Sequence, residues 1–180
     1  MCRRARSSLV ATIVFTFVLS VWNFQPVNRA RASTLPNRIY LPGIVVSPPF
    51  WSTDELRAVD VINQQRKNAG CPAVQINREL SVAAKQHSQD MATNRYFSHI
   101  GQDGSSFGQR ARIAGYTYQP SGEIISAGRT TADATVNDWM GSPPHRSIIL
   151  TCANDDIGIG LSVVPNSVYQ YYWTVVFGQR

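Results

Sequence analysis

The spacing of apolar residues changes once along the chain, and this change limits the folds that the sequence can form. Up to Leu150, apolar residues recur at intervals of three and four, as they do in amphipathic helices. After Cys152, they alternate with glycine and serine over residues 157–163, and alternation resumes from Tyr169 to Phe177. The turn formers Pro165-Asn166-Ser167 separate the two runs. The sequence therefore predicts an α+β domain in which helices precede a β-hairpin.

Cap and turn residues set the expected ends of the helices. A capping box of Ser52 and Glu55 starts the first helix, which Gly70 ends. Asn77 caps a second helix that runs to about Asn94. Shorter helices are expected from Phe107 to Ala114, from a cap at Thr130 or Thr131 to Met140, and from Ser142-Pro143 onward, and a third strand is expected near Tyr116 to Tyr118.

The first 32 residues have the organisation of a secretory signal peptide. Arg3, Arg4 and Arg6 precede the uncharged run Leu9–Trp22, and Ala30-Arg31-Ala32 supplies a small-x-small cleavage pattern. The run has 14 residues, fewer than the roughly 20 that cross a bilayer as a helix. We therefore expect a secreted protein without a stable membrane span after cleavage. An uncleaved anchor is the alternative.

Most of the positive charge belongs to this leader. The sequence has 17 lysine and arginine residues against 11 acidic ones, a net charge of +6, and five of the basic residues but no acidic residue precede Ala32. Removing residues 1–32 leaves twelve basic and eleven acidic residues, a net charge of +1. The densest remaining basic pairs are Arg66 with Lys67 and Arg110 with Arg112, and both are expected on exposed helix faces. A nucleic-acid partner is therefore not expected.

Proline marks the expected start of the folded domain. Residues 33–51 contain four prolines, at positions 36, 42, 48 and 49, and almost no charge. This composition predicts an extended linker. The folded domain is expected to occupy residues 52–180.

Two cysteines remain after the leader, Cys71 and Cys152. In an oxidising compartment, two cysteines in a small domain are expected to form one disulfide. A bridge that closes about 80 residues would stabilise the fold by roughly 4 to 5 kcal/mol in the chain-entropy model. Two buried thiols are the alternative, and two cysteines alone do not make a structural zinc site.

The chain has three histidines. His87 lies on the apolar face of the second helix, which indicates a buried structural residue. Its position next to Ser88 leaves a second role open, that of a residue at the border of a cleft. His99 lies in a glycine-rich turn. His145 lies in the first turn of a helix that starts with proline, from which its ring can project into a cleft.

A serine motif lies in the same region of the chain. The run Gly104–Gly108 matches the G-x-S-x-G pattern of α/β-hydrolases, and Asp138 and His145 follow it in the order typical of those enzymes. That pattern requires a buried strand directly before it, and residues 100–103 do not form one. The expected role of the run is a serine-rich turn that caps a helix.

Eight further motifs lie between Leu56 and Gly178. They are Ala84-x-x-His87-Ser88-x-Asp90-Met91, the run YFSH at 96–99, Asp103-Gly104, Gly115-Tyr116, Gly122-Glu123, Trp139-Met140-x-Ser142-Pro143-x-His145-Arg146, Ile157-Gly158-Ile159-Gly160, and Tyr172-Trp173 to Phe177-Gly178. In this order they resemble the bacterial branch of the CAP superfamily. That superfamily groups cysteine-rich secretory proteins, antigen 5 and pathogenesis-related 1 proteins, and its domain is also called SCP-like.

The resemblance implies an α-β-α sandwich with a three-stranded antiparallel sheet. It also implies a central cleft with two histidines and two acidic residues, in which some members bind zinc or another divalent cation. By position, His99, His145 and Glu123 are the expected cleft residues and metal ligands. The second glutamate of the family is Ser142 here, and the family's Gly-Glu-Asn motif reads Gly122-Glu123-Ile124, so this chain lacks one carboxylate and one amide.

Two readings of the cleft chemistry stay open. Two imidazoles and one carboxylate suffice for an open zinc site, and Glu123 can instead orient one imidazole by accepting a hydrogen bond from its ring. Two functions therefore compete. One is a secreted module that binds a lipid, a glycan or another cell-envelope component, and the other is a metal-dependent hydrolase, protease-like or esterase-like. The sequence shows no nucleophile with a defined substrate.

Overall fold

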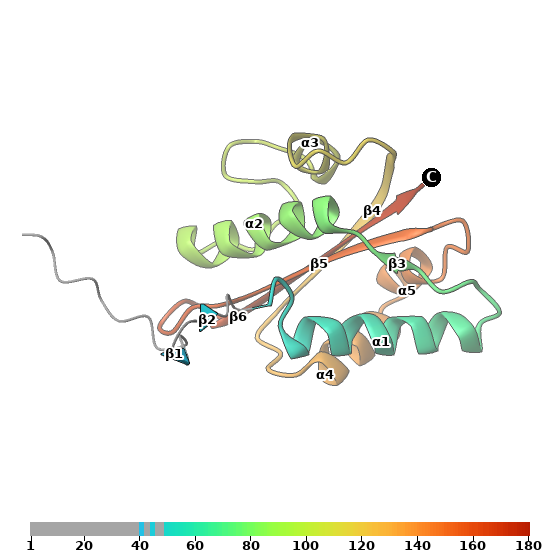
Figure 1. Ribbon diagram of the computed structural model, residues 1–180, viewed down its shortest axis with the longest axis horizontal. Coiled ribbons are helices and arrows are strands. Elements are labelled where there is room, and N and C mark those ends of the chain that lie inside the picture. Colours follow the sequence, from blue (N-terminus) through green and yellow to red (C-terminus); the bar gives the residue numbers. More distant parts are fainter. Residues whose placement is uncertain (1–39, 42–43, 46–48) are drawn as a thin grey trace, which may run out of the picture. The chain divides into compact units, whose positions relative to one another are not determined.

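The computed structural model describes residues 40–41, 44–45 and 49–180, and the chain divides into two compact units after Pro48. In the first unit, β1 (Tyr40–Leu41) pairs antiparallel with β2 (Ile44–Val45). The second unit, described without gaps from Pro49 to Arg180, contains five helices and four strands (Figure 1). The predicted signal peptide, residues 1–32, and most of the predicted linker lie outside the described residues.

The second unit begins before the expected boundary at residue 52. The Trp51 side chain packs against the main core cluster, and its Nε1 donates to Ser81 Oγ over 3.0 Å. The guanidinium of Arg78 lies 4.2 Å from the centroid of the Phe50 ring. The last residues of the proline-rich stretch thus belong to the folded domain, because their aromatic rings are packed against it.

The helices begin where the cap residues predict. The Ser52–Glu55 capping box is present, and Asn77, Ser106 and Thr131 each accept a hydrogen bond from the first turn of the helix that follows. Gly70, at φ +79°, follows the end of the first helix as expected. The bounds are α1 Thr53–Asn68, α2 Arg78–Asn94, α3 Phe107–Ile113, α4 Ala132–Gly141 and α5 Pro143–Ile149.

The sheet differs from the expected three-stranded antiparallel one. The predicted hairpin is formed by β5 (Asp156–Val163) and β6 (Tyr171–Gln179), and β4 (Gln119–Ala127) pairs antiparallel with β6. In addition, β3 (Gln75–Ile76) pairs parallel with the start of β5, so the order is β3-β5-β6-β4 and the sheet is mixed. The expectation was wrong on this point because a strand of two residues shows no alternation.

The third strand begins later than expected. The amide of Tyr116 donates to Ala111 O over 3.0 Å, and Gly115 has φ +97°. Residues 116–118 therefore complete the turn that ends α3, and the strand starts only at Gln119.

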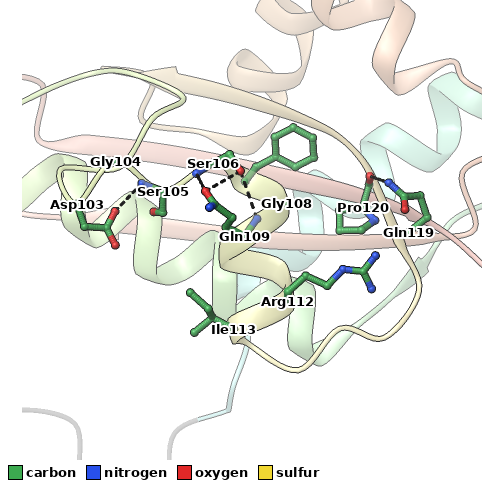
Figure 2. A pocket seen from close by; sticks show the side chains of 11 residues that line it. Asp103, Gly104, Ser105, Ser106, Gly108, Gln109, Arg112, Ile113, Gln119 and Pro120 are labelled. Carbon is green, nitrogen blue, oxygen red and sulfur yellow. Dashed lines mark hydrogen bonds between the residues drawn. The ribbon is translucent and has the colours of Figure 1, made fainter.

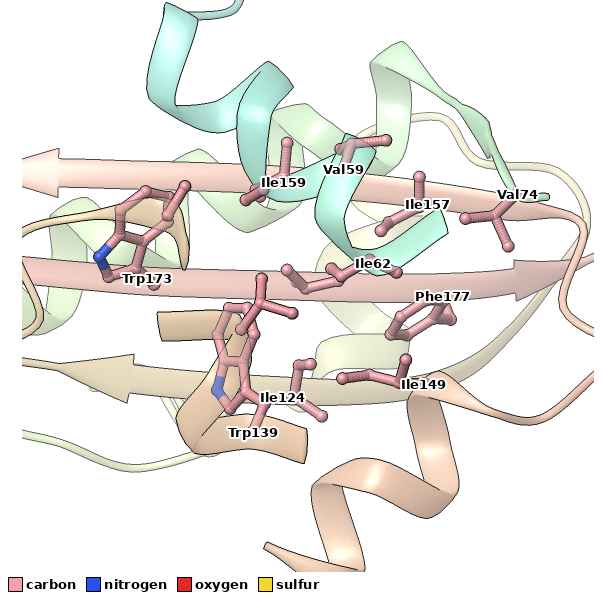
Figure 3. Close-up of a cluster of buried hydrophobic side chains, with 14 residues drawn as sticks. Val59, Ile62, Val74, Ile124, Trp139, Ile149, Ile157, Ile159, Trp173 and Phe177 are labelled. Carbon is pink, nitrogen blue, oxygen red and sulfur yellow. The ribbon is translucent and has the colours of Figure 1, made fainter. Parts of the chain in front are cut away.

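Helices cover both faces of the sheet, which confirms the α-β-α sandwich. In Figure 1, α2 and α3 lie on one side of the strands, and α1, α4 and α5 lie on the other. The larger core lies on the α1 side, where Trp139 and Trp173 are buried among aliphatic chains (Figure 3). It consists of Ala58, Val59, Ile62, Val74, Ile124, Ala132, Val136, Trp139, Ile149, Ile157, Ile159, Trp173, Val175 and Phe177.

The predicted disulfide between Cys71 and Cys152 is present and joins residues 81 positions apart. Beside it, the buried guanidinium of Arg66 donates to the carbonyl oxygens of Pro72, Ile149, Thr151 and Asn154 over 2.7–2.9 Å. These bonds connect the end of α1 to the end of α5 and to the loop before β5. Arg66 was expected on an exposed helix face. Its burial is compensated by four backbone acceptors instead of by solvent.

The outer edge of β5 beyond β3 is covered by side chains. The amide of Ile159 donates to Ser81 Oγ over 3.2 Å, and the amide of Leu161 donates to Glu55 Oε1 over 2.9 Å. Glu55 is buried, accepts a hydrogen bond from the Ser52 amide, and forms an ion pair with Lys85. One carboxylate thereby connects α1, α2 and the sheet edge.

Glycine allows α2 to lie directly on β5. A Cβ at Gly158 would lie 2.1 Å from the carbonyl carbon of Leu80, and a Cβ at Gly160 would lie 2.3 Å from the amide nitrogen of Lys85. Both contacts are with backbone, which cannot rotate away. The Ile157-Gly158-Ile159-Gly160 motif is thus required for packing. Its isoleucines fill the core on one face of the sheet, and its glycines leave room for α2 on the other face.

We predict that Gly160→Ala lowers the free energy of unfolding by about 3 kcal/mol or more, because the added methyl group overlaps the α2 backbone. Gly141→Ala is the matched control, because Gly141 lies in α4 and a Cβ there would meet no heavy atom within 4 Å. That control is expected to leave stability unchanged or raise it by up to about 1 kcal/mol. Urea denaturation measures both. Equal stabilities of the two variants would contradict the backbone contact.

Candidate functional site

The candidate site lies along the edge strand β4, where elements from both faces of the sheet meet. Gly122 admits α5 on one face, since a Cβ there would lie 2.9 Å from Ile148 Cγ2. The next residue, Glu123, points to the opposite face because side chains alternate along a strand. There it meets the loop between α2 and α3, which carries His99.

Glu123 is the buried centre of a three-residue network. Its Oε1 lies 2.9 Å from His99 Nδ1, and its Oε2 accepts from Arg110 Nη2 over 2.7 Å. The Glu123 side chain is 1% exposed and that of Arg110 10%, whereas His99 is 51% exposed. Since a carboxylate oxygen only accepts, the Nδ1 of His99 carries the proton of this bond. The Nε2 of His99 is left as the free ring nitrogen.

The backbone around His99 is fixed by the side chains of His87 and Arg110. His87 Nε2 lies 2.9 Å from the carbonyl oxygen of Ser98, and Arg110 Nη2 donates to the carbonyl oxygen of His99 over 3.1 Å. Arg110 Nη1 also donates to Ser105 O over 2.7 Å. The loop therefore presents the imidazole in one orientation.

His87 is a buried residue beneath this loop. It is 1% exposed, and its Nδ1 has no hydrogen-bond partner. Burial lowers the pKa of His87, so the ring is neutral and Nε2 carries the proton that it donates to Ser98. The sequence left its role open. In the structure it supports the segment that carries His99.

His145 and Ser142 line a separate cavity of about 630 Å³ beside β4. The pKa of His145 is lowered by burial and by the proximity of His99. Ser142 starts α5 without a side-chain cap bond. The other lining residues are Phe97, Ile125, Ser126, Ala127, Asn137, Asp138, Trp139, Gly141 and Tyr169. The structure thus joins His99 to Glu123 by a hydrogen bond. Ser142 and His145 lie together on the wall of the cavity, which neither His99 nor Glu123 lines.

The observed arrangement does not fit a zinc site with His99, His145 and Glu123 as three ligands. Both oxygens of Glu123 are occupied, one of them by a guanidinium. Within residues 49–180 and the short strands before them, no group of three or more His, Cys, Asp or Glu side chains is arranged to hold a metal ion. The hydrogen bond between Glu123 and His99 is the other arrangement that the sequence left open.

Arg110 is the site residue that the sequence did not reveal. It was expected on an exposed face together with Arg112, and only Arg112 is exposed. Arginine in a short helix is usually exposed, so burial was not the expected outcome. The one available signal was an acidic residue, Glu123, directly before the apolar pair Ile124-Ile125 of a strand, because a buried carboxylate requires a partner.

The serine motif has the capping role that the sequence predicts. Ser106 Oγ accepts from the Gln109 amide over 3.4 Å, and Gln109 Oε1 accepts from the Ser106 amide over 2.8 Å. Figure 2 shows both side chains at the wall of a cavity of about 770 Å³ between α3 and the start of β4. Neither Asp138 nor His145 lines it, so the motif is not part of a Ser-His-Asp site.

The family described as "CAP: Cysteine-rich secretory protein family" matches residues 59–177, well over half of the chain. The chain belongs to this family. The matched range contains β4, the His99 loop and the cavity with His145, so the whole candidate site lies in the CAP domain.

Individual relatives agree with this assignment. "Uncharacterized protein YkwD" of Bacillus subtilis is 33% identical over 114 residues, which are 63% of this chain and 44% of that protein. The chain thus spans less than half the length of the curated relatives it matches.

Solved structures show the same fold. An outer surface protein from Borrelia burgdorferi matches with a TM-score of 0.65 at 21% identity, over 75% of this chain and 99% of that one. An extracellular protein containing a SCP domain from Bacillus anthracis matches with a TM-score of 0.64 at 25% identity, over 74% of this chain and 45% of that one. Of the helices in the described part of the chain, none has the length and apolar character needed to cross a membrane.

We predict that His87 makes stability depend on pH. The pKa of His87 is lowered in the folded state, so below about pH 6.5 the unfolded chain binds a proton that the folded chain does not. The free energy of unfolding therefore decreases as the pH is lowered below about 6.5, by up to about 1.4 kcal/mol per pH unit for this proton. His87→Gln retains an N–H donor for Ser98 O and removes the titration. Urea denaturation between pH 7 and pH 5 should show a shallower slope for this variant, and equal slopes would contradict the assignment.

Proposed function

We propose that this chain is a secreted CAP-domain module that binds a lipid, a glycan or another cell-envelope component in the cavity beside β4. The leader pattern of residues 1–32 supports export. Two proteins of similar structure, an outer surface protein of Borrelia burgdorferi and an extracellular protein of Bacillus anthracis, point in the same direction.

The observation that carries the proposal is the aromatic wall of this cavity. Phe97 and Tyr169 are 45% and 46% exposed, and their rings meet edge to face with centroids 6.1 Å apart. Tyr169 also contacts Tyr172, whose ring centroid is 5.8 Å away. Large aromatic side chains left open at the mouth of a cavity are typical of ligand contact.

The cavity is also lined by polar residues, and these decide which ligand class is favoured. Asn137, Ser142 and His145 contribute amide, hydroxyl and imidazole groups, whereas the Asp138 carboxylate is ion-paired with Arg129. A ligand that suits both the aromatic and the polar lining residues needs an apolar face and several hydroxyl or amide groups, as a pyranose sugar has. An aliphatic chain would leave the polar groups without partners at a cost in binding free energy. We therefore place glycans first among the three ligand classes.

We predict that Phe97→Ala and Tyr169→Ala each weaken ligand binding about 30-fold, since an aromatic anchor of this kind contributes about 2 kcal/mol. Tyr118→Ala is the matched control, because Tyr118 is 50% exposed but does not line the cavity. Glycan arrays and lipid-vesicle sedimentation with residues 49–180 identify the ligand class. Binding that both cavity variants retain in full would contradict the proposal.

A hydrolase that uses His99 as its general base is the second candidate. It is favoured by the pair of His99 and Glu123, because a buried carboxylate that fixes one imidazole tautomer is how enzymes hold a general base. His99 Nε2 would accept the proton of an attacking water.

We predict for this second candidate that ester or peptide turnover is lost in His99→Ala and reduced in His145→Ala. Assays run with and without added zinc, together with calorimetric zinc titration, separate metal-assisted from metal-independent turnover. Absence of turnover under both conditions would eliminate the hydrolase and leave the binding module.

A further inference from the structure

We propose that Arg110 decides the chemistry of the buried Glu123 carboxylate. By occupying one oxygen, Arg110 commits Glu123 to orienting His99 and withholds the carboxylate from divalent cations. This inference is independent of the ligand that the cavity takes.

The first support is charge. Glu123 is 1% exposed, and a carboxylate at such a position needs a positive partner. Arg110 supplies that charge over 2.7 Å. A divalent cation bound to the same oxygen would also supply positive charge, and it would lie within a few Å of the guanidinium. Because like charges at that distance repel, Arg110 and a metal compete for Glu123.

The second support is that Arg110 cannot leave without opening the loop. Its two terminal nitrogens donate to Ser105 O, His99 O and Glu123 Oε2. The loop closes tightly over it: a Cβ at Gly101 would lie 2.7 Å from both Asp103 Oδ1 and Ser105 Oγ and 3.6 Å from Arg110 Nη1. The guanidinium is thus a fixed part of the site and not a mobile surface charge.

The third support is the effect on His99. Because Arg110 fixes Oε2, the remaining Oε1 faces His99 Nδ1 and requires a donor there. The arrangement selects the Nδ1-protonated tautomer and leaves the Nε2 lone pair exposed. Arg110 therefore acts on His99 through Glu123, as a positioning residue.

Zinc calorimetry tests the metal part of the proposal. Arg110→Met keeps the length of the side chain and frees Glu123 Oε2, so zinc affinity should rise about tenfold or more over the wild type. Arg112→Met is the matched control, since Arg112 is exposed on the same helix and bonds only backbone oxygens. The double variant Arg110→Met/Glu123→Gln should return to the wild-type affinity. A folded Arg110→Met protein with unchanged affinity would overturn the proposal, as would wild-type zinc binding that Glu123→Gln abolishes.

NMR tests the positioning part without metal and without the Arg110 variant, which keeps a test available if that variant does not fold. Nitrogen chemical shifts of the imidazole report which ring nitrogen carries the proton. The wild type should show His99 protonated at Nδ1. In Glu123→Gln, Arg110 should hold the amide oxygen and turn the NH₂ group towards His99, which must then accept at Nδ1 and protonate at Nε2. An unchanged Nδ1-protonated tautomer in this isosteric variant would show that Arg110 does not control the pair.

Discussion

The backbone of α2 lies against the backbone of β5, and the arrangement of the domain follows from this contact. Only glycine at positions 158 and 160 allows it, because any Cβ would overlap α2. In this position α2 places Ser81 and Lys85 at the edge of β5 and buries His87 against the Ser98 carbonyl of the following loop. It also offers Leu80 and Ala84 to α3 and Val176, which sets where α3 packs. The small side chains of one strand thereby determine where a helix and the loop after it can lie.

The candidate site is a consequence of that placement. The loop that leaves α2 reaches the edge strand β4, where His87 and Arg110 bind consecutive carbonyl oxygens, those of Ser98 and His99. The Glu123 side chain, which extends from β4, forms a hydrogen bond with the imidazole of His99. On the other side of the same strand, Trp139 Nε1 donates to Ile125 O over 3.0 Å and fixes α4 and the cavity wall. An edge strand with helices on both faces thus brings a rigid imidazole and an aromatic cavity close together.

Local signals allowed much of this to be predicted from the sequence. Caps such as Ser52, Asn77 and Thr131 act within one turn, and alternation over 157–163 reports a strand directly. The features that escaped are set by distant residues. β3 exists only because β5 lies beside it, and Arg110 is buried only because Glu123 arrives from β4, thirteen positions along the chain. The order of the motifs identified His99, Glu123 and His145 as site residues. It did not show which of them are in contact, because their contacts depend on how closely the loop between α2 and α3 packs against β4.

The covering of the sheet edges has a consequence for how molecules meet one another. Unpaired strand amides are the usual template on which a second chain adds its own strand. On β5 these amides are already bonded to Ser81 and Glu55, and on β4 the Ile125 carbonyl is bonded to Trp139. Two copies that collide therefore find side chains in place of open backbone at these positions. The same groups that hold the helices in place thereby keep these positions of β5 and β4 from pairing with a strand of a second molecule.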